Sequence, residues 1–231
     1  MALNPLMLEK LFADVEKGDA IASMGYPDII YPPEKLREAL GDKILGLKYR
    51  EDSPAICKRH GIAQRDIPDA ESLFEVLGAS LDVFDVVQER GCETIVDLNY
   101  PIPAQACDQF NWVLDVGTME HCFNAPQALV NMAALLKVGG HVLHENPFNW
   151  GNHGFWNLNP TLFHDFYGDN GFEVLGCWLL PRGSNEIYEC PKAGRFQYLK
   201  SEANLFTIAR KVDQVEIKFP VQAKYRHLIK G

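Results

Sequence analysis

The strongest constraint on the fold of this chain is an alternation of short apolar segments with amphipathic ones, which becomes regular after residue 70. Apolar segments of strand length occupy residues 20–31, 80–87, 92–99, 111–117, 141–147, 172–180 and 203–212, and helical patterns occupy residues 70–78, 124–137 and 160–171. Short apolar strands that alternate with helices are typical of a parallel sheet that is covered on both faces. The sequence therefore predicts an α/β fold with a doubly wound, mostly parallel, seven-stranded sheet.

The helical pattern over residues 124–137 has well-defined ends. Asn124 is a good helix cap, Pro126 lies in the first turn, and the Gly139–Gly140 pair follows the last turn. Two more helices are expected nearer the N-terminus, at residues 5–17 within the N-terminal helical segment 1–19 and at residues 33–40. Residues 41–69 are polar and irregular, as in a lid over a site or in an ordinary surface connection.

Length and charge limit the classes of function. The 231 residues fit a single domain spanning 1–231, because no Ser/Gly-rich linker divides them. The chain has 22 Lys and Arg against 31 Asp and Glu, a net charge of −9, so we expect a small-molecule partner and no nucleic acid. The oligomeric state is left open.

Membrane and secretory features are not expected. No apolar run approaches the roughly 18–20 residues of a membrane-spanning helix, so we expect no membrane partner. The N-terminus is too acidic for a signal peptide, and the six cysteines form no C-x-x-C pair. These features predict a cytoplasmic protein without a disulfide framework.

Carboxylates lie at or near the ends of three predicted strands. Asp82 or Asp85 belongs to the first of these strands, Asp97 follows the second and Asp115 the third. Ligands of doubly wound sheets bind at the carboxyl ends of the strands, where such groups can accept hydrogen bonds from ribose hydroxyls or an adenine amino group. The alternative is that aspartate is simply a good residue for turns and helix caps.

Three segments carry a resemblance to a known family. They are FNWVLDVGTMEHCFNAPQALVNMAALLKVGGHVLHENP (residues 110–147), DLNYPIP (97–103) and NHGFWNLNPTLFHDFYGDNGFEV (152–174). With the Glu120–His121 pair and the LLKVGGHVL run, residues 70–174 resemble the class I, Rossmann-like S-adenosylmethionine-dependent methyltransferases, and more narrowly a bacterial subgroup of them.

The resemblance implies S-adenosylmethionine as cofactor and assigns roles to individual residues. Asp82, with Asp85 as the alternative, would hold the ribose hydroxyls, and Asp97 and Leu98 would flank the adenine. Asp115, Gly117 and Thr118 would line the methionine and sulfonium end.

The glycine turn after the first strand departs from the family pattern of an acidic residue followed by Gly-x-Gly. The matching stretch is SMGYPDI, with Gly25 followed by Tyr26 and Pro27, and Pro27 has no N–H for the usual amide cradle. Either the cofactor binds through a modified turn, with Tyr26 or Asp28 compensating, or cofactor binding has been lost.

Candidate catalytic residues are His121, His153 and Glu120. Methyl transfer to a hydroxyl requires in-line alignment and removal of one proton, and a histidine near neutrality suits the second task. His121 follows the fourth strand of the family pattern and His153 lies in the loop after the fifth, whereas His141 and His144 are expected to be structural. The expected activity is O-methylation of a sugar or another polyhydroxylated metabolite.

The same resemblance offers a second interpretation of these residues, as ligands of a metal ion. Some relatives use a Glu and a His after the fourth strand and a later His to hold a divalent ion, and Glu120, His121 and His153 match these three ligands. The fourth ligand, an acidic residue three positions before the Glu, is Gly117 here. The sequence therefore predicts no metal site.

Two other functions remain as alternatives. A non-catalytic, methyltransferase-like binding subunit would explain the altered glycine turn, although such a subunit would not need Asp82, Asp97 and Asp115 together. A nicotinamide-dependent oxidoreductase is disfavoured, because no G-x-G-x-x-G follows a predicted strand.

Overall fold

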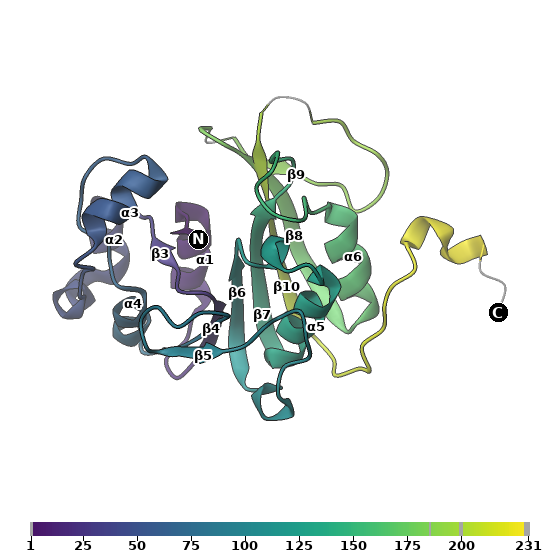
Figure 1. Ribbon diagram of the computed structural model, residues 1–231, viewed down its shortest axis with the longest axis horizontal. Coiled ribbons are helices and arrows are strands. Elements are labelled where there is room, and N and C mark those ends of the chain that lie inside the picture. Colours follow the sequence, from purple (N-terminus) through teal and green to yellow (C-terminus); the bar gives the residue numbers. More distant parts are fainter. Residues whose placement is uncertain (1, 185, 199–200, 229–231) are drawn as a thin grey trace. The chain divides into compact units, whose positions relative to one another are not determined.

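The computed structural model describes residues 2–184, 186–198 and 201–228 as two compact units, which divide between Val96 and Asp97 (Figure 1). Each unit combines strands with helices, so the predicted α/β class is confirmed. All seven predicted strands occur, together with shorter ones. The assignment of residues 1–231 to a single domain stays a prediction.

Unit 1 contains three parallel strands in the order β5-β4-β2 and a separate parallel pair, β1 with β3. Its elements are β1 (Ala2–Leu3), α1 (Pro5–Asp14), β2 (Ala20–Met24), β3 (Asp28–Ile29), α2 (Pro33–Leu40), the 3-10 helix η1 (Gly41–Gly46), α3 (Ser53–His60), α4 (Ala70–Leu77), β4 (Ser80–Asp85) and β5 (Glu93–Ile95).

Several boundaries in unit 1 differ from the predictions. The expected helix over residues 5–17 ends at Asp14, because Val15 has extended backbone angles. The expected strand at 20–31 is broken at Gly25, which has a φ of +85°, and only Asp28 and Ile29 resume strand geometry, in β3. The third strand shrinks from 92–99 to Glu93–Ile95.

The prediction that residues 41–69 are irregular is wrong. The segment contains η1 and the helix α3, whose first turn includes Pro54, a position that proline favours. It has a small core of its own, in which Ile56 and Cys57 pack with Ile67. The lid role of this segment stays a prediction.

Unit 2 contains five strands in the order β6-β7-β10-β8-β9. Its elements are the 3-10 helix η2 (Ala104–Ala106), β6 (Phe110–Val116), η3 (Met119–His121, 3-10), α5 (Ala125–Leu135), β7 (Leu136–Pro147), α6 (Pro160–Asp169), β8 (Phe172–Pro181), β9 (Tyr188–Glu189), β10 (Ala203–Lys211) and η4 (Ala223–Leu228, 3-10). β6 and β7 are parallel, whereas β10 lies between β7 and β8 and is antiparallel to both. Helix α5 packs against β6 and β7, and α6 packs against β8 and β10 (Figure 1).

The start of α5 is as predicted, but its end is not. The side chain of Asn124 caps the helix by accepting a hydrogen bond from the backbone N–H of Gln127. The helix ends at Leu135 instead of residue 137, and β7 begins at Leu136 instead of residue 141. The extra residues belong to an irregularity in the β6–β7 pairing, where the register shifts between Phe110 and Trp112.

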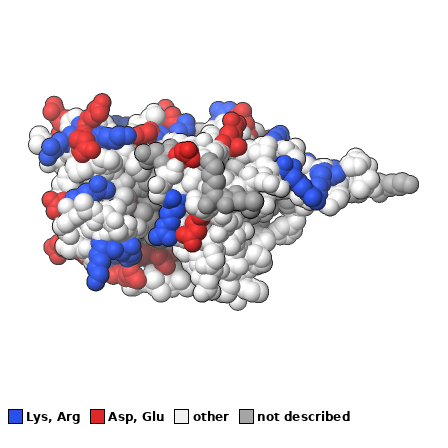
Figure 2. Space-filling model, turned by 90° about the horizontal axis from the view of Figure 1, so that it is seen from above, with Lys and Arg blue, Asp and Glu red and all other residues white. Residues whose placement is uncertain are grey.

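The surface carries charged side chains of both signs. Acidic and basic side chains are interspersed on the face drawn in Figure 2. Within the described residues, no helix combines the length and the apolar character needed to cross a bilayer.

Candidate functional site

The parallel pair β6 and β7 brings four polar residues to one edge of the sheet. Because the strands run in the same direction, their carboxyl ends coincide, and Asp115 of β6 is paired in register with His144 of β7. Asn146 lies two residues further along β7, and Glu120 follows β6 in η3. All four side chains are buried.

Asp115 is held by four donors and is fully buried. Its Oδ1 accepts from the backbone N–H groups of Thr118 and Met119, at 3.2 and 3.0 Å. Its Oδ2 accepts from Asn146 Nδ2 at 2.9 Å and lies 2.7 Å from His144 Nδ1. A carboxylate with these partners fixes the turn after β6. Its expected place in the lining of the methionine end stays a prediction.

His144 and Tyr167 extend this network into α6. The two ring nitrogens of the fully buried His144 contact Asp115 on one side and the Tyr167 hydroxyl, at 2.6 Å, on the other. Nδ1–H donates to the carboxylate, so Nε2 accepts from the tyrosine hydroxyl. Burial raises the pKa of Tyr167 well above its ordinary value, which keeps the hydroxyl protonated as the donor. These contacts join β6, β7 and α6.

Glu120 is the buried carboxylate with an unused oxygen. Its Oε2 accepts from Asn146 Nδ2 at 3.0 Å, whereas its Oε1 has no hydrogen-bond partner among the described residues. Burial, followed by the nearby charge of Asp115, raises the pKa of Glu120 to about 7. Glu120 therefore exchanges a proton in the neutral range, as a general acid or base requires.

His121 and His153 lie next to that unused oxygen. The distance from Glu120 Oε1 is 3.9 Å to His121 Nε2 and 3.6 Å to His153 Nε2, and the ring centroids of the two histidines are 5.2 Å apart. Both side chains are partly exposed. Burial, followed by the charge of His153, lowers the pKa of His121. The structure thus brings together the three residues that the sequence singled out as catalytic candidates.

The loop after β7 holds His153 in place through its backbone. Phe155 N–H donates to the carbonyl oxygen of Glu120 at 2.9 Å. A Cβ on Gly154 would lie 2.8 Å from the same oxygen, so the loop approaches η3 as closely as only glycine allows. The Trp156 indole also donates to the carbonyl oxygen of Cys122, at 3.1 Å.

The Asp97–Asn99 turn is fastened to α5. The side chain of Asn131 donates to the carbonyl oxygens of Leu98 and Tyr100, at 3.1 and 2.8 Å. Asn99 Oδ1 accepts from the backbone N–H of Asn124 at 2.8 Å. Asp97 is exposed, and its Oδ1 accepts from the backbone N–H and the Nδ2 group of Asn99 at 2.9 and 2.7 Å, whereas Leu98 is buried. The roles of Asp97 and Leu98 beside the adenine stay predictions.

Gly117 and Thr118 form the turn between β6 and η3. Gly117 has a φ of +82°, a conformation that glycine adopts without strain, and both residues are partly exposed. Their roles at the methionine end stay predictions.

In unit 1, the residues around the altered glycine turn are committed to other contacts. The Tyr26 hydroxyl donates to Asp69 at 2.7 Å, and Arg90 lies over the Tyr26 ring, 4.3 Å from its centroid. Burial and the bond to Asp69 raise the pKa of Tyr26. Asp28 is buried and forms ion pairs with Arg50 and Arg59. The side chains of Tyr26 and Asp28 are thus engaged within unit 1, and their compensating role stays a prediction.

Asp85, and not Asp82, closes β4. Asp82 is exposed in the middle of the strand, paired with Ala22. Asp85 is the last residue of β4, and its Oδ1 accepts from the N–H groups of Val86 and Val87 at 2.7 and 3.2 Å. Of the two residues named for the ribose hydroxyls, Asp85 is thus the one at the carboxyl end of β4, and the role of either stays a prediction.

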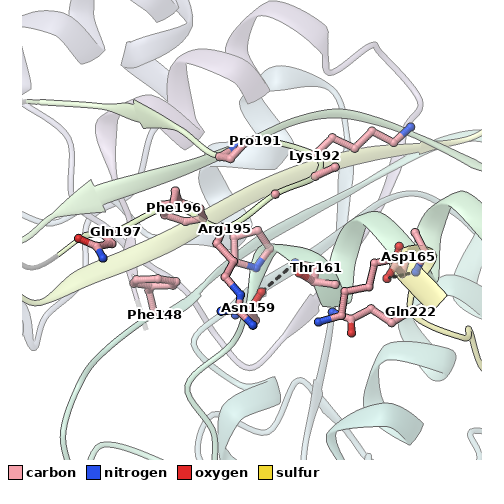
Figure 3. Close-up of a pocket in the computed structure, with 15 residues that line it drawn as sticks. Phe148, Asn159, Thr161, Asp165, Pro191, Lys192, Arg195, Phe196, Gln197 and Gln222 are labelled. Carbon is pink, nitrogen blue, oxygen red and sulfur yellow. Dashed lines mark hydrogen bonds between the residues drawn. The ribbon is translucent and has the colours of Figure 1, made fainter.

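Two cavities lie elsewhere in the units. One in unit 2, of about 590 Å³, surrounds the start of α6 (Figure 3), and one in unit 1, of about 480 Å³, lies beside Arg50 and Arg90. In the first, the helix end is already capped, because Asn159 Oδ1 accepts from the N–H of Thr161 at 3.0 Å, the dashed line in Figure 3. None of the predicted site residues is among the described residues that line these two cavities.

From the sequence, Asn146 is recognised only as a residue that closes a strand, Tyr167 is missed, and His144 is expected to be structural. Asn146 links both carboxylates through its single Nδ2 group. Its position at the end of β7, next to Pro147, is where ligands of such sheets bind, but no sequence pattern shows that its side chain contacts both carboxylates.

Similarity to known proteins is limited to the three-dimensional structure. No protein-family model and no curated protein matches the chain. A Burkholderia thailandensis 1,6-didemethyltoxoflavin-N1-methyltransferase, solved with 1,6-didemethyltoxoflavin and S-adenosylhomocysteine, has a TM-score of 0.48 and 14% identity, over 89% of this chain and 76% of that chain.

Two further solved structures have similar scores. A putative methyltransferase from Bacillus halodurans has a TM-score of 0.49 and 9% identity, over 90% of this chain and 99% of its own. A putative zinc-dependent alcohol dehydrogenase from Rhodobacter sphaeroides has a TM-score of 0.49 and 12% identity, over 90% of each chain. All three TM-scores are below 0.5, and all three identities are 14% or lower.

Proposed function

We propose that the chain is an S-adenosylmethionine-dependent methyltransferase that acts on a hydroxyl group of a small, polyhydroxylated acceptor. The observation that carries the proposal is the Glu120–His121–His153 cluster at the carboxyl ends of β6 and β7. This cluster lies in the segment whose sequence resembles the methyltransferases, and it combines a half-titrated carboxylate with two accessible imidazoles.

The strand order of unit 2 supports the same assignment. The last strand of the sheet, β10, lies antiparallel between β7 and β8, at the end of a series that otherwise alternates with helices. An inserted antiparallel last strand is typical of the class I methyltransferase fold that the sequence resembles.

The chemistry asked of the protein is alignment and the removal of one proton. The acceptor oxygen attacks the methyl carbon as the carbon–sulfur bond breaks, so S-adenosylhomocysteine leaves and the hydroxyl proton passes to a base. We assign this proton to His121 or His153, with Glu120 stabilising the imidazolium that forms. The low pKa of His121 leaves its ring neutral and ready to accept.

On the cofactor side, the exposed Asp97 and the buried Leu98 are the residues that we propose for the adenine. Gly117 and Thr118, which form a partly exposed turn, are proposed for the methionine end. Asp115 holds this turn by accepting hydrogen bonds from the backbone N–H groups of Thr118 and Met119. We therefore assign it a positioning role.

Calorimetric titration tests the cofactor assignment. Protein shown to be free of bound nucleoside is titrated with S-adenosylmethionine and with S-adenosylhomocysteine, and micromolar binding of both is expected. An Asp97→Ala variant is expected to bind at least about tenfold more weakly, the loss of one charge-assisted hydrogen bond. Absence of binding in a protein that unfolds cooperatively would refute the proposal.

Turnover tests the base. Methyl transfer from isotopically labelled S-adenosylmethionine is measured with a panel of sugars and other polyhydroxylated acceptors. His121→Ala and His153→Ala are expected to keep cofactor affinity, and loss of most turnover in one of them identifies the base. His227→Ala, which changes an exposed histidine of η4, is the matched control. Unchanged turnover in both site variants would remove the histidines from the mechanism.

A non-catalytic binding subunit is the second candidate, and one observation favours it. Tyr26 and Asp28 are engaged by Asp69, Arg50 and Arg59, so the altered glycine turn has no evident replacement for the missing amide groups. Failure to bind either nucleoside would support this candidate.

A further inference from the structure

Two buried cysteines face each other at the edge of the sheet in unit 2. Cys177 lies in β8 and Cys190 follows β9, and because Trp178 pairs with Glu189, the antiparallel register places the two cysteines directly opposite each other. The backbone N–H of Cys190 donates to the carbonyl oxygen of Cys177 at 2.8 Å. We propose that these two cysteines form a reversible disulfide, which fastens residues 190–197 to β8.

The backbone arrangement suits such a bond. Opposite residues of an antiparallel pair have their side chains on the same face of the sheet. Where backbone hydrogen bonds join them, their Cα atoms are about 5.5 Å apart, within the range of about 4.4–6.8 Å that disulfides span. The two thiols, both free in this structure, also share a side-chain hydrogen bond, so the sulfur atoms are neighbours.

The surroundings activate one of the two sulfur atoms. The hydrogen bond from the Cys190 thiol, with His164 and Thr207, lowers the pKa of Cys177 in spite of its burial. Thr207 Oγ1 lies 3.3 Å from the Cys177 sulfur. The hydrogen bond to Cys177 and burial raise the pKa of Cys190. Because the thiolate is the nucleophile in disulfide exchange, Cys177 is the attacking residue and Cys190 the one that completes the bond.

A buried nitrogen of α6 belongs to the same cluster. Helix α6 packs against β8 and contributes His164, whose side chain acts on Cys177. His164 Nε2 is buried and has no hydrogen-bond partner among the described residues. Buried polar atoms are almost always paired, because an unpaired one loses its hydration without compensation. This nitrogen is therefore available to take up a thiol proton when the pair reacts.

The edge of the sheet gives reagents a way to the pair. β9 is the outermost strand of its sheet and consists of two residues, Tyr188–Glu189. A strand with so few pairs opens locally at low cost in free energy. Beyond it, residues 191–197 are exposed and line the cavity of about 590 Å³ in Figure 3. Local opening of β9 therefore admits a small disulfide to sulfur atoms that are otherwise buried.

The oxidant is a low-molecular-weight disulfide, for which oxidised glutathione is the probe. The Cys177 thiolate attacks one of its sulfur atoms, the bond between the two glutathione sulfurs breaks, and one glutathione thiolate leaves. The Cys190 sulfur then attacks Cys177, and the second glutathione thiolate leaves as the protein disulfide forms. The protons of the two cysteines end on the two glutathione thiols. The protein thus loses two electrons, which the oxidant gains, and an excess of reduced glutathione reverses both steps.

Peptide mapping of the full chain tests the proposal. Reduced protein is incubated with oxidised glutathione, its remaining thiols are blocked with N-ethylmaleimide, and the denatured chain is digested with trypsin. Trypsin cleaves after Arg182, between the two cysteines, so the disulfide would link peptides 138–182 and 183–192. We expect the linked peptides in most chains and expect dithiothreitol to separate them. Absence of the linked peptides would overturn the proposal.

Single replacements distinguish the two cysteines. Cys190→Ser is expected to leave Cys177 joined to glutathione, because the second thiol is missing. Cys177→Ser is expected to retain at least about tenfold less glutathione at Cys190, because burial still raises the pKa of that thiol. Cys107→Ser, in the same unit, is the matched control and should form the linked peptides as the wild type does. Equal glutathione incorporation in the first two variants, with unchanged far-ultraviolet circular dichroism, would refute the role of Cys177 as the attacking residue.

Limited digestion of the folded protein tests the fastening of residues 190–197. Lys192 and Arg195 are exposed trypsin sites in this segment. Cleavage there is expected to be at least about fivefold slower in the oxidised protein, because the bond suppresses the local opening of β9. Cleavage after the exposed Lys43 of unit 1 should proceed equally in both forms. Equal rates at Lys192 and Arg195 in the two forms would show that the bond does not fasten the segment.

Discussion

At the scale of single residues, burial changes the pKa of Glu120 and therefore the pH at which it releases its proton. A carboxyl group whose pKa is raised from 4.5 to about 7 keeps its proton in the folded protein while the unfolded chain has lost it. The free energy of unfolding should therefore fall as the pH rises from about 4.5 to 7 and then level off. The contribution is on the order of 3 kcal/mol, because each pH unit of displacement corresponds to about 1.4 kcal/mol.

Glu120→Gln isolates this contribution. The amide does not titrate in this range, so the difference in unfolding free energy between wild type and variant should depend on pH. Denaturant titrations at half-unit pH intervals measure that difference. Parallel pH curves for the two proteins would show that the pKa of Glu120 is the same in the folded and unfolded states.

Gly154 tests the close packing of the loop that carries His153. A Cβ there would lie 2.8 Å from the Glu120 carbonyl oxygen, a backbone atom that cannot easily move. Gly154→Ala is expected to reduce the free energy of unfolding by about 1–3 kcal/mol, as overpacking does. Gly151→Ala, in the same loop but with open space around the new Cβ, is the matched control and should have little effect. Equal effects in denaturant titrations would contradict the packing argument.

At the scale of elements, the buried bond between Tyr167 and His144 connects α6 to β7. Tyr167→Phe removes the hydroxyl and leaves His144 Nε2 buried without a donor. The expected loss is about 1–3 kcal/mol of unfolding free energy, the usual cost of an unsatisfied buried group. Tyr225→Phe removes an exposed hydroxyl from η4 and should change stability by less than about 0.5 kcal/mol. Chemical denaturation of the two variants makes the comparison, and similar losses would refute it.

Elements could be predicted from the sequence where local signals are strong. Helix α2 was predicted with its observed bounds and α4 to within one residue, because both have apolar faces at helical spacing and clear ends. Helix α3 was missed because Pro54 reads as a break unless it falls in the first turn. The start of β7 at Leu136 depends on its pairing with β6, and the sequence around Leu136 does not indicate that pairing.

The site was predicted less completely than the elements. Glu120, His121 and His153 were identified as candidates and are brought together, since the end of β6 and the loop after β7 lie at the same edge. The burial of Asp115 and the linking role of Asn146 were not foreseen. Both depend on side chains from different elements, whose meeting is decided by packing and not by spacing along the chain.

At the scale of the whole molecule, net charge leads to a prediction about the acceptor. The chain has nine more acidic than basic residues, and on the face in Figure 2 the two kinds are interspersed. Nonspecific binding to nucleic acid depends on releasing counterions from phosphates through clustered Lys and Arg. We therefore expect no binding of a fluorescein-labelled RNA at about 100 mM salt and protein concentrations up to about 10 µM, measured by fluorescence anisotropy.

The control for this measurement is a basic protein of similar size, which should raise the anisotropy under the same conditions and lose that effect as salt is added. Binding by the present chain with a steep salt dependence would mean that a local basic surface outweighs the net charge. In that case the acceptor search would move from polyhydroxylated small molecules to RNA, while the assignments of the cofactor and of Glu120 would stand, because neither depends on the identity of the acceptor.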